Sequence, residues 1–408
     1  MKILHTADWH LGKKLDTYSR HQEQVSVMNE IAQLAEKEQV DALIVSGDLF
    51  DAFNPPIESV DLFYKSLKQM ANNGKRAVIC IAGNHDSPDR IEAPDPLAKE
   101  CGIIFAGYPN SQVTPFKLDT GLELTRSAGG FIELQLPAAA YPLRILLTPY
   151  ANEYRFRTFL GSENTEEALS NIIGEQWRQL AETYCDTHGV NILAAHLFMS
   201  KAGTEPEPEP DDEKPILHVG GAQIIDTSLI PVQMQYVALG HLHRYHQVGG
   251  AKCPVVYSGS PVAYSFNEAD QQKYVSLITL EPSKTAVVEK LPLNAGKRLL
   301  RVKITGVSET IRWLEAHNDA LVELTLVSDT FISAADRKLI MQTHDGIISI
   351  IPEVLNNDFQ HENTANIDLS KSMKALFIDY FTSVKGMPPD TTLLDLFKEV
   401  LAHESFEK

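Results

Sequence analysis

The sequence AVICIAGNHD, residues 77–86, sets a run of apolar residues directly before a glycine and three polar side chains. The apolar run predicts a short buried β-strand, and the glycine lets the chain turn sharply where that strand ends. Asn84, His85 and Asp86 then supply side chains that can bind a metal or transfer a proton. Alone, such a tetrapeptide is more typical of a polar turn that merely ends a strand.

The same arrangement recurs after four other apolar segments. Asp8 and His10 follow 2–6, Asp48 follows 43–46, His196 follows 191–195, and His241 and His243 follow 236–239. Open α/β sheets place their active sites at the carboxyl ends of their strands. Each of these motifs is common alone, but five of them, each after an apolar segment, together predict one metal centre at the ends of the strands.

Composition sets the broad class of the protein. The 408 residues are 43% hydrophobic, which allows two or three domains with a sizeable core. The net charge of −18 argues against nucleic-acid binding through bulk charge, although a local basic groove remains compatible with it. Four cysteines without paired spacing predict a reduced protein. The polar N-terminus and the lack of an apolar run of roughly 20 residues predict a cytoplasmic protein with no membrane segment.

The order of expected elements predicts a parallel sheet followed by antiparallel hairpins. Strands at 2–6, 42–46 and 77–81 alternate with helices at 25–35 and 58–70, which is typical of parallel strands joined by crossovers. Short apolar runs and turns across 103–150 indicate antiparallel hairpins. Residues 1–295 are therefore expected to form a first domain.

A smaller unit is expected after residue 295. Strands at 299–304, 320–326 and 347–351 alternate with helices at 309–317 and 334–342, so residues 296–351 predict a small α/β capping domain. Residues 352–367 are polar and are interpreted as a linker. Two amphipathic segments within 368–408 predict C-terminal helices, which either pack on their own domain or dock on a partner.

The residue types favour a paired divalent metal site. Asp48 is the natural bridge, and a mixture of carboxylate and imidazole ligands suits manganese, iron or zinc better than magnesium alone. Two ions roughly 3.5–4 Å apart can activate water and neutralise a phosphate during in-line displacement. His85 is expected either to stabilise the transition state or to protonate the leaving oxygen, with Asp86 fixing its tautomer and raising its pKa.

These motifs, in this order, resemble those of the calcineurin-like metallophosphoesterase superfamily. The longer strings KILHTADWHLG (2–12), GDLFD (47–51), ALGHLH (238–243) and YSGSP (257–261) narrow the resemblance to its double-strand-break nucleases, which work with an SMC-like ATPase. The resemblance covers essentially the whole chain. It implies a four-layer α/β/β/α metallophosphoesterase domain.

The resemblance also implies a ligand set, an activity and partners. One manganese ion would be held by Asp8, His10, Asp48 and His243, and the other by Asp48, Asn84, His196 and His241, with His85 and Asp86 as the catalytic pair. The activity would be 3'-5' exonuclease and endonuclease cleavage of double-stranded DNA ends, hairpins and single strands, in DNA repair, recombination and replication. A homodimer would assemble with the SMC-family ATPase into a heterotetramer, with residues 368–408 docking on the ATPase.

Some features leave alternatives open. Ala195 stands where many relatives carry glycine, and the acidic, proline-rich loop 205–213 would disfavour DNA nearby. Basic residues near the motif loops are either phosphate contacts or ordinary surface charges: Lys13, Lys14, Arg20, Arg90, Lys201 and Arg244. Trp9 is expected to pack beneath the site. A free-standing phosphoesterase acting on small or protein phosphates is the competing interpretation, and a non-catalytic binding protein is disfavoured because every predicted ligand is present.

Overall fold

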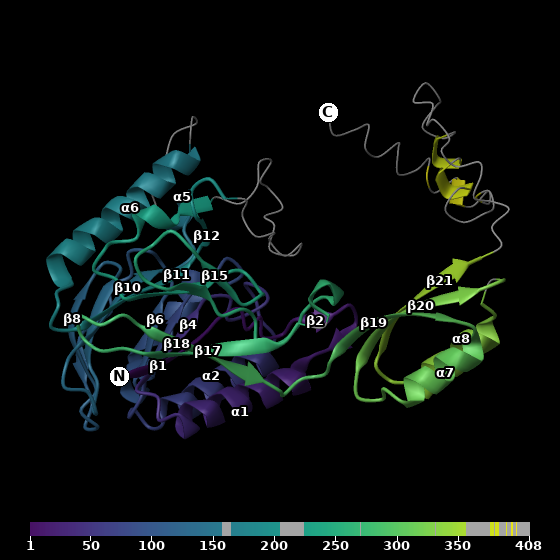
Figure 1. The fold of residues 1–408 in the computed structure, drawn as a ribbon, viewed down its shortest axis with the longest axis horizontal. Coiled ribbons are helices and arrows are strands. Elements are labelled where there is room, and N and C mark those ends of the chain that lie inside the picture. The colour runs from purple at the N-terminus through teal and green to yellow at the C-terminus, as the bar shows by residue number, and fades with distance from the viewer. Residues whose placement is uncertain are drawn as a thin grey trace.

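The computed structural model describes residues 1–156, 165–204, 224–269, 271–330 and 332–355, together with short stretches between 376 and 397. Two β-sheets pack face to face, with α1 (His21–Lys37) and α2 (Ile57–Ala71) on one outer side and α6 (Thr165–Tyr184) on the other (Figure 1). This is the predicted four-layer α/β/β/α arrangement, which is confirmed.

The first sheet has six strands in the order β18-β17-β1-β4-β5-β6. Its centre is parallel, because β1 (Lys2–Thr6), β4 (Ala42–Ser46), β5 (Ala77–Ile81) and β6 (Ile103–Ala106) run in one direction. The long hairpin of β17 (Lys273–Thr279) and β18 (Val287–Leu293) adds antiparallel strands beside β1. The start of β17 therefore lies at the same edge as the end of β1.

The second sheet has eight strands in the order β15-β16-β14-β11-β10-β9-β8-β7. Of the antiparallel hairpins predicted across 103–150, the structure has β7 (Phe116–Lys117), β8 (Glu123–Ala128), β9 (Phe131–Gln135) and β10 (Leu143–Thr148). The prediction is wrong for residues 103–106, because β6 pairs in parallel with β5 in the first sheet. Next to the hairpins, β11 (Val190–His196), β14 (Tyr236–Gly240) and β16 (Val255–Tyr257) run parallel to β10, and β15 (His246–Val248) closes the edge. Beside this sheet, β12 (Phe198–Ser200) pairs with β13 (Ile224–Asp226).

Three apolar layers hold these elements together. Alternate residues along β1, β4 and β5 face opposite ways, so Leu4 and Leu43 pack under α1 and α2 while Ile3 and Ile44 face the second sheet. The outer face of the second sheet packs against α6 through Trp177 and its neighbours. Short connections complete the domain: β2 (Lys14–Leu15), β3 (Tyr18–Ser19), α3 (Pro88–Glu92), α4 (Asp95–Ala98) and α5 (Glu153–Phe156).

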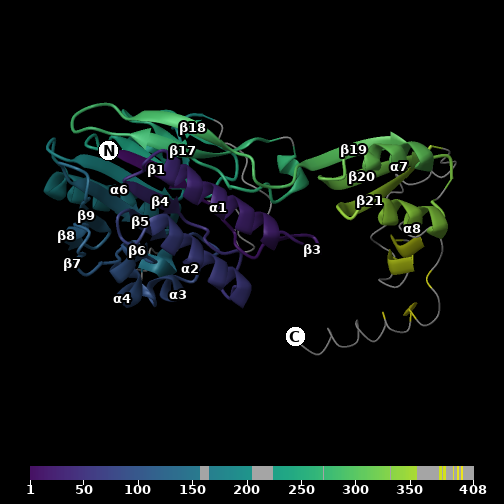
Figure 2. The same ribbon diagram turned by 90° about the horizontal axis from the view of Figure 1, so that it is seen from below.

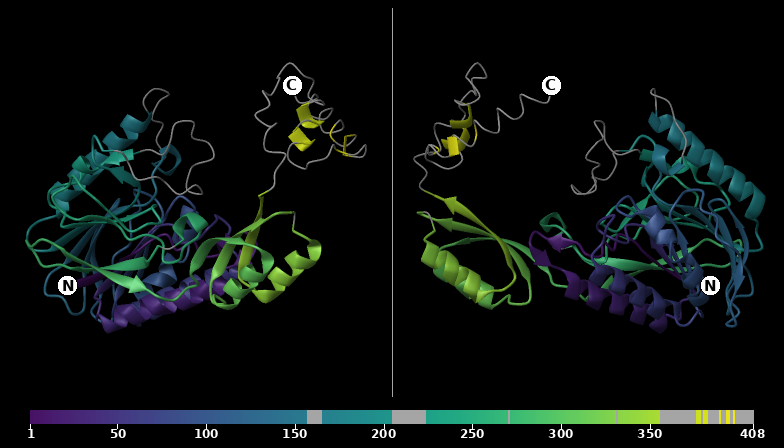
Figure 3. Two further views of the ribbon diagram at one scale, coloured as in Figure 1. Left: turned by 45° about the vertical axis from the view of Figure 1, so that its right-hand side comes forward. Right: turned by 180° about the vertical axis from the view of Figure 1, so that it is seen from behind.

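A separate three-stranded sheet follows at the far end of the molecule (Figures 1 and 3). Its strands β19 (Leu299–Thr305), β20 (Leu321–Ser328) and β21 (Ile347–Val354) are parallel, and α7 (Val307–Glu315) and α8 (Ala334–Thr343) provide the crossovers. Leu314, Leu324 and Ile340 belong to its own buried core. Figure 2 shows the same unit beyond the end of α1.

Two expectations about the second half of the chain meet the structure only in part. The linker expected at 352–367 overlaps the last strand, because β21 continues to Val354. Residues 356–375 and most of 368–408 lie outside the described residues, as does the acidic loop 205–213. Among the described residues, no helix combines the length and apolar character that a membrane crossing requires.

Candidate metal centre

The seven predicted ligands come together where the carboxyl ends of strands from both sheets meet. Asp8 and His10 follow β1, Asp48 follows β4 and Asn84 follows β5 in the first sheet; His196 ends β11, and His241 and His243 follow β14 in the second. The site is therefore complete only when the two sheets are packed on each other. Nearly all of these side chains are buried, and Asn84 is partly exposed.

Asp48 lies at the centre of the cluster. Its Oδ2 atom is 3.6 Å from His10 Nε2 and 3.3 Å from His196 Nε2, so it faces histidines from both sheets. On one side, His10 Nε2 and His243 Nε2 are 3.0 Å apart. On the other side, Asn84 Oδ1 lies 2.8 Å from His196 Nε2 and 3.4 Å from His241 Nδ1. Asp48 thus stands between two groups of ligand atoms, as a bridging carboxylate would.

The donor set suits divalent cations. His196 Nδ1 lies 2.8 Å from the Ser46 carbonyl oxygen, which can only accept a hydrogen bond, so neutral His196 turns its Nε2 lone pair toward Asn84 and Asp48. The buried Asp8 Oδ2 has no hydrogen-bond partner within the described part of the chain. A buried carboxylate oxygen without a hydrogen-bond donor leaves room for a positive charge. Asp8, Asp48 and His196 bring ligand atoms within 4.8 Å of one another.

The electrostatics of the site also favour a cation. Burial raises the pKa of Asp8 to about 7, with Asp48 adding to the rise. Burial alone would lower the pKa of His196, but the Asp48 and Asp8 carboxylates and the Ser46 carbonyl raise it to about 9. Both shifts arise from carboxylates crowded together away from water. A bound cation would offset that repulsion.

The backbone around these ligands is strained. Four of them have positive φ angles: 53° at Asp8, 41° at His10, 47° at Asp48 and 109° at His241. Non-glycine residues rarely adopt this region, and they cluster there at functional sites. Each of these φ values belongs to a turn in which the chain leaves a strand and points a ligand across the sheet edge.

Glycines allow the ligand loops to approach each other. A Cβ atom on Gly83 would lie 2.0 Å from Asp48 Oδ1, and one on Gly240 would lie 1.8 Å from the Ser46 carbonyl oxygen. Gly47 has a φ of 89°, and a Cβ atom there would lie 2.2 Å from His196 Nδ1. No larger residue fits these positions without moving a ligand.

His85 lies beside the cluster, with its ring centroid 4.9 Å from that of His10. Its backbone N–H donates to Asp48 Oδ1 at 3.0 Å, and its Nδ1 lies 2.9 Å from the carbonyl oxygen of Asp51. Asp51, which follows β4, thus orients the His85 ring through its backbone.

Asp86 has a different place from the one expected. Its fully buried carboxylate accepts backbone hydrogen bonds from Leu49, Phe50 and Gly83 at 3.0, 3.0 and 2.8 Å. The expectation that Asp86 fixes the tautomer of His85 is therefore wrong, because the Asp51 carbonyl oxygen lies at His85 Nδ1 while the Asp86 carboxylate accepts from backbone N–H groups. Asp86 instead ties the turn after β5 to the turn after β4.

Arg155 in α5 contacts the same turn and was missed from the sequence. Its guanidinium donates to the carbonyl oxygens of Gly83 and Asp86 at 2.8 and 2.9 Å, and it lies over the ring of Tyr150. Only 3% of Arg155 is exposed. It lies in α5, several residues beyond the end of β10, so the pattern of a polar residue close behind a strand does not mark it.

Two of the basic residues considered as phosphate contacts are already paired with carboxylates. Arg20 is buried and forms a bidentate pair with Glu23, so it is neither a phosphate contact nor a surface charge. Lys13 Nζ lies 3.2 Å from Asp51 Oδ1. Trp9 is fully buried, donates to Thr6 Oγ1 and packs against Phe63, which confirms the expected packing role.

Comparisons with known proteins agree with this geometry. The calcineurin-like phosphoesterase family model matches residues 1–245. The chain is 34% identical to the SbcD subunit of the nuclease SbcCD of Bacillus subtilis (strain 168), over 98% of this chain and 97% of that protein. It is 32% identical to the Rhodobacter capsulatus protein of the same name, over 76% and 73% of the two chains. The protein of that name from Escherichia coli (strain K12) is 26% identical, over 83% and 81%. Together with the strand-end ligand cluster, these matches show that the chain belongs to the calcineurin-like phosphoesterase family.

Proposed function

We propose that this chain is the metal-dependent DNA nuclease component of a complex with an SbcC-like SMC-family ATPase. It hydrolyses phosphodiesters at DNA ends and hairpins, as a 3'-5' exonuclease and an endonuclease. The observation that carries the proposal is the largely buried cluster of seven nitrogen and oxygen ligands, Asp48 at its centre and six others around it, drawn from both sheets. The nuclease names of the relatives, which align along most of this chain, support a nucleic acid as the substrate.

Two divalent ions, manganese in this proposal, would share Asp48. Asp8, His10 and His243 would complete one set of ligands, and Asn84, His196 and His241 the other. When bound, such ions neutralise charge on the scissile phosphate and activate water as the nucleophile. Proton transfer to the leaving oxygen would depend on side chains of this protein.

His85 would give a proton to the leaving oxygen. Its Nδ1 faces the Asp51 carbonyl oxygen, which fixes the ring and leaves Nε2 as the nitrogen for proton transfer. Arg155 and Asp86 would keep His85 in place by holding the turn around it from both sides. Positioned proton transfer of this kind typically contributes about 10²–10⁴-fold to a rate.

The test is cleavage of a DNA hairpin by the full-length protein with Mn²⁺, with and without the ATPase partner. His85→Ala should still bind two Mn²⁺ ions but cleave at least 10²-fold more slowly. Asp48→Ala should lose ion binding as well. His188→Ala is the matched control, because that side chain is exposed and pairs only with Asp186 among the described residues.

Two results would contradict the proposal. If His85→Ala cleaves as fast as the wild type, the proton-donor role is wrong. If the protein hydrolyses small phosphodiesters but cleaves no DNA even with the partner present, it is a free-standing phosphoesterase.

A further inference from the structure

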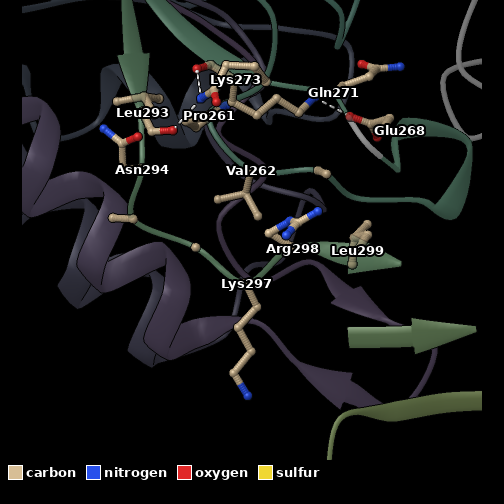
Figure 4. A pocket seen from close by; sticks show the side chains of 14 residues that line it. Pro261, Val262, Glu268, Gln271, Lys273, Leu293, Asn294, Lys297, Arg298 and Leu299 are labelled. Atoms are coloured by element: carbon tan, nitrogen blue, oxygen red, sulfur yellow. Dashed lines mark hydrogen bonds and ion pairs between the residues drawn. The ribbon is translucent and has the colours of Figure 1, made fainter. Parts of the chain in front are cut away.

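A buried ion pair lies directly behind the metal centre, at the junction with the small α/β unit. Glu268 ends the short 3₁₀ helix η3 (Phe266–Glu268), and Lys273 begins β17. They form an ion pair and are only 8% and 9% exposed. Both line a cavity of about 350 Å³ that also contacts the connection to β19 (Figure 4).

The Glu268 carboxylate is fixed on its own side by the backbone. Its Oε1 accepts from the N–H groups of Tyr264 and Ser265 at 3.0 and 3.2 Å, as part of a capping box on η3. Its Oε2 receives Lys273 Nζ. These hydrogen bonds fix the orientation of the Glu268 carboxylate. A side chain that faces it therefore meets a hydrogen-bond acceptor in a fixed position.

The side chain that faces Glu268 is the imidazole of His243. His243 Nδ1 lies 3.6 Å from Glu268 Oε1, while its Nε2 lies 3.0 Å from His10 Nε2 within the ligand cluster. An acceptor beside Nδ1 favours the tautomer with the proton on Nδ1, which leaves the Nε2 lone pair for a metal. Tyr264, four residues before Glu268, packs edge-on against His243 and His10, with ring centroids 6.0 and 5.5 Å apart.

Lys273 contacts the backbone of His243. Its Nζ donates to the carbonyl oxygen of His243 at 2.9 Å and to Ser260 Oγ at 3.0 Å. The Ser260 N–H donates to the same carbonyl oxygen at 3.0 Å. The Glu268 carboxylate thus lies beside the His243 ring at 3.6 Å, while Lys273 donates to the His243 backbone carbonyl and also pairs with Glu268.

We propose that Glu268 and Lys273 are positioning residues that set the ring orientation and tautomer of His243 as a metal ligand. This inference rests on the proposed two-metal site. A purely structural ion pair would stabilise the fold without affecting the two ions differently. A positioning pair affects mainly the ion that His243 holds.

The test is titration of the full-length, metal-free protein with Mn²⁺, followed by calorimetry and by electron paramagnetic resonance of the bound ion. Glu268→Gln keeps the size of the side chain and removes its charge. Loss of an oriented carboxylate behind a ligating histidine typically costs about 10–100-fold in metal affinity. We therefore expect one of the two dissociation constants to rise by about that factor and the other to stay unchanged.

Two further variants make the result decisive. The double variant Glu268→Gln, Lys273→Met leaves neither charge buried without its partner, so it should fold even if the single variant does not. It should show the same loss of affinity for one of the two ions. Glu133→Gln is the matched control, since Glu133 is also 8% exposed and paired, with Arg126 and Arg144. It should bind both ions as the wild type does.

The outcomes separate this inference from the proposed function. If both Glu268 variants bind two ions with wild-type affinities, the positioning role is overturned. It is also overturned if both affinities fall equally in the Glu268 variants and in Glu133→Gln, because the effect is then one of general stability. A wild-type protein that binds fewer than two ions would overturn the two-metal site itself, and this inference with it.

Discussion

Replacement of Arg155 tests how the turn carrying Asn84 and His85 is held. In Arg155→Met, a side chain of similar length remains, but the carbonyl oxygens of Gly83 and Asp86 lose their donor. The negative charges of Asp86 and Asp48 also lose a nearby cation that interacts with them. The turn should therefore become both less stable and less well placed for chemistry.

The structure gives the size of this effect. Hydrogen bonds from a charged donor contribute about 1.5–3 kcal/mol each, and the two short bonds of Arg155 together imply about 3 kcal/mol at the lower end. For a domain of this size, that loss corresponds to a fall in Tm of roughly 5–10 °C. Displacement of catalytic groups by about 1 Å can reduce turnover by about 10²-fold.

Thermal unfolding and hydrolysis of a small chromogenic phosphodiester at saturating Mn²⁺ measure these two effects separately. Arg144→Met is the matched control, because Arg144 is also buried but pairs with Glu133 and Asp186. It should lower Tm and leave kcat unchanged. If Arg155→Met unfolds and turns over like the wild type, the guanidinium does not hold the turn and the reasoning is refuted.

Three other substitutions test separate parts of the structure. Gly47→Ala should abolish Mn²⁺ binding in a calorimetric titration, because its Cβ atom would lie 2.2 Å from His196 Nδ1. Burial alone would raise the pKa of Glu133, but Arg126 and Arg144 lower it from 4.5 to about 2. The ionised Glu133 carboxylate therefore stabilises the fold above pH 4.5, and this stabilisation is lost as the pH falls toward 2. Urea unfolding should therefore show Glu133→Gln less stable than the wild type at pH 7, with the difference shrinking below pH 4.5. Leu314→Ala should destabilise the small α/β unit by about 2–5 kcal/mol, seen as earlier urea unfolding by Trp313 fluorescence, without changing phosphodiester hydrolysis.

The central strands could be predicted from the sequence because they are buried on both faces. Runs such as 42–46 and 77–81 are almost continuously apolar, and the structure has β4 and β5 at those residues. Helix ends were less accurate: α1 begins at His21, ahead of the periodic run from 25, because its first turn is polar. The convergence of the ligands within each sheet followed from one rule, that parallel strands end at the same sheet edge, whereas the packing of the two sheets joins the two groups of ligands.

What the sequence could not supply is the direction of side chains and the residues that support the ligands. Neighbours in a turn can have different partners, as His85 beside the Asp51 carbonyl oxygen and Asp86 on backbone N–H groups do. Arg155 and Glu268 reach the site from segments that no strand-end pattern marks, and only the packing of the two sheets brings them there. Such supporting groups follow from tertiary structure rather than from local pattern.

The left-handed backbone at Asp8, His10, Asp48 and His241 also has an evolutionary consequence. A non-glycine residue in such a conformation costs about 1–3 kcal/mol, and glycine relieves most of that cost. Glycine in place of Asp8 or Asp48 would also remove a buried carboxylate. We therefore expect a lineage selected only for heat resistance, without any need for hydrolysis, to exchange these ligands for glycine long before its apolar core changed.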